Sequence, residues 1–272
     1  MRSETFSTAG PVRLNLEIPT GEIELETAQT EETHVELEAV SDDDAVRDLV
    51  ENARIELMRR GDGYEVAVEA KTRQGIFISI SRSTGIRFGS PDVRLRISCP
   101  HGAALDVRTK SADLRARGEY GSVEFKTASG DIELDEAKGP AHIKTVSGDV
   151  HIERAGSSLE VQAVSGDLYV RESRGSITAN TVSGDQRFEA VQEGRVEVKA
   201  ISGDVSVGIR SGSRFYVDAN TVSGATSSEL ELGDAPAEEA APGAPLVEVF
   251  AKTVSGDVRI ERAPAQAQIA SN

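Results

Sequence analysis

The 272-residue sequence contains no tryptophan and a single cysteine, and only 4% of its residues are aromatic. One cysteine excludes an internal disulfide framework and a cysteine-based zinc cluster. No apolar run approaches the ~20 residues that a membrane-spanning helix requires, and the first residues carry no apolar stretch typical of a secretory signal. We therefore expect a cytoplasmic protein without direct membrane insertion, whose association with the cell envelope would need a partner.

Basic side chains are scarce as well, because 30 Lys and Arg stand against 46 Asp and Glu, a net charge of −16. This charge repels a phosphate backbone, so we expect no nucleic acid partner. A charged fraction of 28% can indicate disorder. Here the charges alternate with apolar residues, which is typical of half-buried strands. Twenty-five glycines spread along the chain favour many short strands joined by turns.

A repeated Ser-Gly-Asp block dominates the sequence from residue 111 onward, and its first copy reads Ser111-Ala112-Asp113. Its serines are Ser111, Ser129, Ser147, Ser165, Ser183, Ser202, Ser223 and Ser255. The successive spacings are 18, 18, 18, 18, 19, 21 and 32 residues. A unit of about 18 residues cannot form a hydrophobic core by itself, so the period indicates units that stack on one another and share a core.

Aligning the copies on the serine reveals two strands in each unit. The strand after the block has one apolar column at Leu114, Ile132, Val150, Leu168 and Val205, and a second at Ala116, Leu134, Ile152, Val170, Phe188, Val207 and Ile260. The strand before it has apolar columns at Val123, Ala141, Leu159, Ile177 and Val196, then at Phe125, Ile143, Val161, Ala179 and Val198. Polar residues lie between the columns, which is the period of a strand. The Thr/Ala and Val/Ile pair just before each serine breaks the alternation and predicts a corner or bulge, with either side chain inward.

These patterns predict an all-β fold, a right-handed parallel β-solenoid with coils of about 18 residues. We expect one solenoid domain over 1–262 and a flexible tail over 263–272. Residues 1–100 would form irregular N-terminal coils and a cap, and 101–262 the regular coils. An acidic insert over 227–243 would be a loop bulging from one coil.

The N-terminal region predicts further strands and one short helix. The expected strands cover residues 12–18, 21–27, 34–40, 53–58, 64–70, 76–81 and 93–98. The helix is expected at about 42–53, where Ser41 and Asp44 form a capping box. Its apolar face would consist of Val46, Leu49, Val50 and Ala53. The glycines of Gly61-Asp62-Gly63 predict a hairpin turn.

Stacking in register would bring the aspartates of the block into a ladder. Its members are Asp113, Asp131, Asp149, Asp167, Asp185, Asp204 and Asp257. Carboxylates ~4.8 Å apart repel by ~3–4 kcal/mol at an effective dielectric of 20, so they need water, backbone N–H groups or cations. We favour turn chemistry, in which glycine supplies a positive φ and Ser and Asp bind the local backbone. A row of calcium sites is the alternative.

No singular catalytic constellation stands out, so we name no catalytic, cofactor-binding or metal-binding residue and expect no enzyme activity and no cofactor. The histidines lack metal-ligand spacing and are expected on the surface: His34, His101, His142 and His151. The serines are interchangeable and include no G-x-S-x-G elbow. Cys99 ends a strand and is expected to be buried. A glycoside-cleaving carboxylate pair would need stacking aromatics nearby, and Tyr169, Tyr216, Phe188 and Phe215 predict no outward cluster.

The repeated Thr-Val-Ser-Gly-Asp-Val block resembles the bacterial putative-adhesin family, a domain of unknown function built from SGD β-repeats. Residues 12–18 followed by Gly21-Glu22-Ile23 resemble the opening strands of that family, and 94–113 resemble the start of its regular coils. The resemblance implies a β-helical fold, and it brings no defined catalytic or binding residues.

Taken together, the repeats favour a non-enzymatic interaction or scaffold protein that presents repetitive polar faces to another protein or a surface ligand. One alternative is a self-assembling, bactofilin-like filament or an envelope-associated structural protein. A further alternative is a polysaccharide-acting β-helix enzyme. The partner, the ligand and the oligomeric state are not encoded in these patterns.

Overall fold

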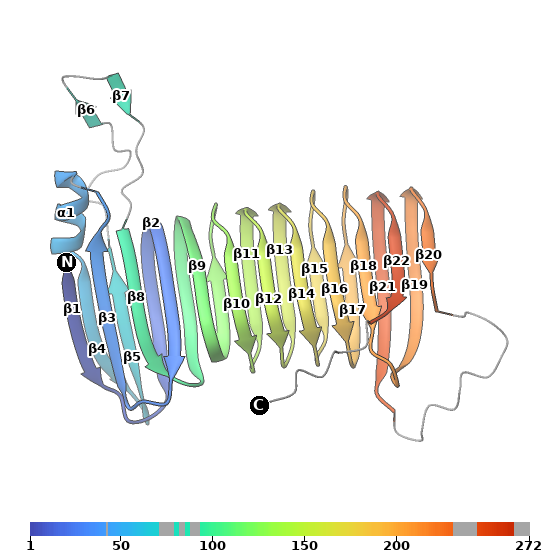
Figure 1. Ribbon diagram of the computed structural model, residues 1–272, viewed down its shortest axis with the longest axis horizontal. Coiled ribbons are helices and arrows are strands. Elements are labelled where there is room, and N and C mark those ends of the chain that lie inside the picture. The colour runs from blue at the N-terminus through green and yellow to red at the C-terminus, as the bar shows by residue number, and fades with distance from the viewer. Residues whose placement is uncertain (42, 71–78, 82–84, 88–92, 231–243, 264–272) are drawn as a thin grey trace, which may run out of the picture. The chain divides into compact units, whose positions relative to one another are not determined.

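The computed structural model describes residues 1–41, 43–70, 79–81, 85–87, 93–230 and 244–263. The chain divides into two compact units, Met1–Asp135 and Glu136–Asn272, called unit 1 and unit 2 below. Strands make up nearly all of the regular structure, so the expected all-β fold is confirmed (Figure 1). The one helix in the described ranges, α1 (Asp44–Glu51), is not long and apolar enough to cross a membrane.

Unit 1 is built around one long strand, β2 (Val12–Ala28), which the sequence predicted as two separate strands. The first half of β2 lies between β5 (Gly63–Glu69) and the start of β9 (Ala103–Lys126), parallel to both. The second half lies between β8 (Val93–Pro100) and the later part of β9, again in parallel. The backbone continues through Gly21 at a φ of +122°. One strand therefore supplies a complete coil of the stack.

Antiparallel strands cover the other side of β5 and β8. Strand β4 (Arg54–Arg60) pairs with β5 through the predicted turn at Gly61–Gly63, and β3 (Glu32–Ala39) pairs with β8. Strand β1 (Arg2–Ser7), which the sequence analysis did not predict, pairs with β3. Strand β6 (Ser79–Ser81) pairs antiparallel with β7 (Gly85–Arg87), and residues 76–78 of the strand expected at 76–81 lie outside the described residues.

Helix α1 begins two residues later than predicted and ends at Glu51 instead of residue 53. The carbonyl of Asp43 accepts the N–H groups of both Val46 and Arg47 at 3.0 Å, which places the first helical turn after Asp43. The predicted apolar face is confirmed, because all four of its residues are at most 5% exposed.

Unit 2 contains the regular coils, each of which gives one strand to each of two sheets (Figure 1). The first sheet begins with β11 (Ala141–Ser147), β13 (Leu159–Ser165), β15 (Ile177–Asn180) and β17 (Gly194–Lys199), all parallel. The second begins with β12 (Val150–Ala155), β14 (Leu168–Ser173), β16 (Gln186–Val191) and β18 (Val205–Ile209). Strand β10 (Ile132–Ala137) spans the boundary between the units. The predicted apolar columns are buried throughout, which confirms the parallel β-solenoid. Its right hand and the single-domain assignment stay predictions.

The last two coils of unit 2 lie in reverse sequence order. Strand β21 (Leu246–Ser255) pairs with β17 on one side and with β19 (Arg214–Ser223) on the other. Likewise, β22 (Val258–Arg262) lies between β18 and β20 (Thr226–Ser228). A loop bulging from one coil was expected at 227–243, and residues 227–228 at its start belong to strand β20. Residues 231–243 of that segment, and 264–272 of the expected tail, lie outside the described residues.

Glycine in the Ser-Gly-Asp bend allows the coils to stack closely. Gly184 has a φ of +122°, and a Cβ added there would lie 2.1 Å from the carbonyl oxygen of Gly166 in the preceding coil. Both the backbone conformation and the space therefore require glycine. This explains why the block recurs with so little variation.

Candidate functional site

Where the corner before the Ser-Gly-Asp bend holds a Thr-Val pair, as at Thr145-Val146 and Thr253-Val254, the threonine is buried and the valine is exposed. Thr145 is 5% exposed, and its hydroxyl donates to the carbonyl of Ser147 at 3.0 Å. Thr253 is 4% exposed and makes the same bond to Ser255 at 3.3 Å. The buried hydroxyl is thus paired, and the neighbouring β-branched apolar side chain is left in solvent.

The outward side chains form a row along unit 2, which we call the aliphatic ridge. In spatial order its members are Val146, Val164, Val182, Ile201, Val254 and Val222. Their exposed fractions range from 43% at Val182 to 82% at Val222. Parallel pairing of the serines that follow them holds the row in register. Soluble proteins rarely leave large contiguous apolar patches exposed unless they bind something.

A shallow groove of about 440 Å³ runs beside the first coils of the ridge. Its lining residues are Lys144, Thr145, Gln162, Ala163, Val164, Asn180, Thr181 and Val182. Lys144, Gln162 and Asn180 pair in register across three strands, and the same column continues at Lys199 and Lys252. We call these five residues the lysine column. Lys199 of this column is paired with Glu197 at 2.6 Å, which leaves Lys144 and Lys252 as its two lysines without an ion pair in the described ranges.

The aspartate ladder binds the backbone of neighbouring coils. The N–H of Asp185 donates to Oδ1 of Asp167 at 2.8 Å, and the N–H of Asp204 donates to Oδ1 of Asp185 at 2.8 Å. Asp113, Asp149, Asp204 and Asp257 accept equivalent bonds in their own units. The turn chemistry predicted for these residues is therefore modified, since each carboxylate links two coils instead of closing its own turn. Across the ranges that the structure describes, no group of three or more His, Cys, Asp or Glu side chains could hold a metal ion.

The histidines lie on the surface, as predicted, and each contacts a polar neighbour. His34 lies 3.1 Å from Glu36, His142 lies 3.2 Å from Glu160, and His151 lies 3.0 Å from Glu153. Nδ1 of His101 lies 3.0 Å from the hydroxyl of Thr27.

The aromatic residues partly contradict the expectation of no outward cluster. Phe188 is buried in the core at 1% exposure. Tyr169, however, stacks on His151 with ring centroids 4.5 Å apart, and Tyr216 lies 5.8 Å from Phe250. Both contacts join residues from different coils, so the linear sequence does not reveal them.

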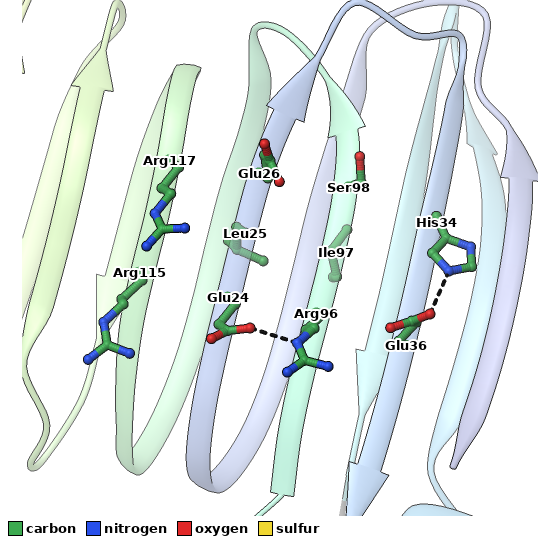
Figure 2. A pocket seen from close by; sticks show the side chains of 10 residues that line it. All are labelled: Glu24, Leu25, Glu26, His34, Glu36, Arg96, Ile97, Ser98, Arg115 and Arg117. Atoms are coloured by element: carbon green, nitrogen blue, oxygen red, sulfur yellow. Dashed lines mark hydrogen bonds and ion pairs between the residues drawn. The ribbon is translucent and has the colours of Figure 1, made fainter.

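Unit 1 has a charged groove of about 270 Å³ across β2, β3, β8 and β9 (Figure 2). Arg96 donates to Glu24 at 2.7 Å, and His34 contacts Glu36 (Figure 2). Beside the groove, Arg94 bridges Glu22 and Glu38 at 3.1 Å each, and these bonds raise its pKa. Opposite charges facing each other across strands stabilise a sheet. We therefore assign this groove a role in holding the strands together.

The titratable groups with displaced pKa values do not favour acid catalysis. Glu56, Glu153 and Glu197 all have lowered pKa values, because Arg54, Arg171 and Lys199 respectively donate hydrogen bonds to them. A glycosidase general acid requires a raised pKa instead. Cys99 is fully buried, as predicted, and desolvation raises the pKa of its thiol to about 12, which disfavours the nucleophilic thiolate.

Comparison with known families identifies this architecture. The family described as Toastrack DUF4097 matches residues 14–261. The chain belongs to the Toastrack DUF4097 family. The match extends from β2 to β22, which confirms the resemblance inferred from the SGD repeat. No curated protein matches this Toastrack chain.

Several solved structures are similar to this Toastrack chain. A putative adhesin from Bacteroides fragilis is 14% identical, with 95% of this chain and 96% of that chain covered and a TM-score of 0.42. A putative adhesin from Parabacteroides merdae is 10% identical, with 95% of each chain covered and a TM-score of 0.37. A putative cell adhesion protein from Clostridium sporogenes is 11% identical, with 96% and 99% covered and a TM-score of 0.28.

Proposed function

We propose that this Toastrack protein is a non-catalytic interaction module, whose aliphatic ridge and lysine column bind an extended segment of another protein. The observation that carries the proposal is the ridge itself, six β-branched side chains held in register at 43–82% exposure. A segment with apolar side chains would cover the ridge. Acidic side chains on the same segment would meet Lys144 and Lys252.

The ridge offers enough apolar surface for specific binding. Fully burying a valine contributes ~1.5–2 kcal/mol relative to full exposure. The ridge residues start about half exposed, so each contributes ~1 kcal/mol and the six together several kcal/mol, before the entropic costs of association. The lysines add charge complementarity, which mainly increases the association rate and the specificity.

The repeated geometry supports a role without catalysis. Catalysis needs one site with particular groups, whereas successive coils here present equivalent side chains. The lowered carboxyl pKa values and the buried thiol favour the same conclusion. For the compartment, we propose the cytoplasm, with envelope association through the bound partner, and cell fractionation tests this.

The experiment compares capture of a cross-linked partner by three forms of the full chain. The ridge variant combines Val146→Thr, Val164→Thr and Val182→Thr, which keep the β-branched shape and add hydroxyls. The matched control replaces outward residues on the other sheet of the same coils: His151→Thr, Tyr169→Thr and Arg187→Thr. We expect the ridge variant to lose the partner captured by the wild type and the control to retain it, with both variants showing native circular dichroism. Equal capture by the wild type and the ridge variant would contradict the proposal.

A further inference from the structure

Strand β19 lies at the end of its sheet in unit 2. In the described ranges it pairs with β21 alone, and β20 pairs with β22 alone. Phe215 and Val217 occupy the columns of Val247 and Val249 in β21. The two β21 residues are 0% exposed, whereas Phe215 and Val217 remain partly exposed. The apolar columns therefore reach the last coil without a further coil over them in the part of the chain described.

The β19 edge has few of the features that keep an edge strand from pairing, and its two charged side chains, Arg214 and Asp218, have opposite signs. Natural edges carry lysine, proline or a bulge, or are short. Strand β19 has ten residues, none of them lysine or proline, and pairs with β21 without a bulge. Tyr216 is 54% exposed and Val222 82% exposed on the same strand. This edge can accept another strand.

We propose that β19 pairs in antiparallel fashion with β19 of a second copy of this chain, across a two-fold axis at Tyr216. Inward residues must face inward residues, so the axis must pass through a residue and not between two. Centred on Tyr216, the pairing puts Arg214 opposite Asp218 of the second copy, twice, and Phe215 opposite Val217. Centred on Asp218, it would oppose two like charges, which is unfavourable. The charges of β19 thus select the Tyr216 register.

This arrangement closes on itself. A two-fold axis perpendicular to the sheet of β19 maps each sheet onto itself, so the edge of β20 also meets its own copy. Such an isologous contact uses the same surface on both copies and gives a dimer, not a filament. This pairing requires no partner bound at the aliphatic ridge.

The test measures the mass of the full-length chain by sedimentation equilibrium over a concentration series at about 0.15 M salt, where a Debye length of ~8 Å screens the long-range repulsion between two chains of charge −16 and acts less on adjacent charge pairs. We expect a rise from 28.9 kDa to twice that value. Arg214→Asp and Asp218→Arg should each weaken the dimer at least about tenfold, because each creates two like-charge pairs. The double variant should restore it. Arg187→Asp, which makes the same charge change on an outward position of β16, should leave the dimer unchanged.

A second measurement reports the axis directly. Tyr216→Cys should form a disulfide-linked dimer under mild oxidation, whereas Tyr169→Cys in the middle of unit 2 should not, and the native Cys99 is buried. A monomer at all concentrations, growth into longer polymers, or a failure of the double variant to restore association would each overturn the two-fold pairing.

Discussion

Replacing Gln186 with leucine should stabilise the protein. Gln186 is 1% exposed and lies in an apolar column between Leu168 and Val205. Its Nε2 donates to the hydroxyl of Thr181 at 2.8 Å and to the carbonyl of Lys199 at 3.4 Å. Its Oε1 is buried and has no hydrogen-bond partner among the described residues. The side chain therefore carries a desolvated acceptor into the core.

The magnitude follows from two opposing changes. Removing a buried, unpaired acceptor gains ~1–3 kcal/mol, and losing the bond to Thr181 costs ~0.5–1.5 kcal/mol. The threonine hydroxyl can then donate to the carbonyl of Ser183, as Thr145 does to Ser147. Leucine fits the volume, since Leu168 occupies the same column one coil away. We expect a net gain of ~1 kcal/mol, a rise in Tm of about 2–4 °C for a chain of this size.

Urea unfolding followed by circular dichroism provides the assay, because a shift of the midpoint at constant slope reports stability alone. Leu168→Gln is the matched control, since it places an amide in the same column of the preceding coil and should destabilise the protein by ~2–3 kcal/mol. If Gln186→Leu lowered the midpoint, the bonds made by Nε2 would outweigh the unpaired oxygen, and the reasoning would be refuted.

Three further predictions concern the bends and the surface. Gly184→Ala should lower the free energy of unfolding by more than ~3 kcal/mol, as measured by urea unfolding. Gly212→Ala, at a φ of +88° with no atom near the added Cβ, should lower it by only ~1–2 kcal/mol. Equal losses would show that the close stacking of coils at Gly184 is unimportant. Asp185→Ala should lower the free energy of unfolding by ~1 kcal/mol, whereas Asp185→Asn should not, because asparagine keeps the hydrogen-bond acceptor and removes a charge from the ladder. If calcium raised the Tm of the wild type relative to chelator, and did not raise the Tm of Asp185→Asn, a cation site would be indicated instead. The pKa of Glu153 is lowered from 4.5 mainly by Arg171 and then by His151, so its contribution to folding stability is present above pH 4.5 and is lost as the pH falls through the lowered value. Glu153→Gln should therefore flatten the acid limb of the curve of unfolding free energy against pH. An unchanged acid limb would rule this contribution out.

The sequence predicted the columns of unit 2 well, because a strand has an invariant period of two. Ile152, Val170 and Phe188 recur at fixed distances from the serine and are all buried. The helical period of about 3.6 residues likewise predicted the buried face of α1, where Val46 and Val50 lie one turn apart.

The aliphatic ridge could not be predicted by the same rule. Threonine and valine have nearly the same shape, and hydropathy alone would place Val146 inside and Thr145 outside. The structure reverses them, because the hydroxyl of Thr145 binds a carbonyl of the bend. Only the geometry of the corner decides between the two.

The spatial order of the last coils could not be predicted from the sequence either. Each coil carries the same columns, so the columns alone do not decide whether β19 or β21 pairs with β17. The 32-residue spacing between Ser223 and Ser255 was the one signal of a change in path. Strand β1 was missed for a different reason: its alternate residues are only partly buried, so its pattern is weak.

The position of β21 between β17 and β19 determines the order in which the last coils of a newly synthesised chain can fold. Residues 214–228 leave the ribosome before residues 246–262, yet β19 and β20 find their described strand partners only in β21 and β22. Residues 214–228 therefore pair only after β21 and β22 have been made, and the fifteen residues of these two strands then order both coils together. A nonsense codon just upstream of Leu246 would consequently leave β19 and β20 without the strands that pair with them.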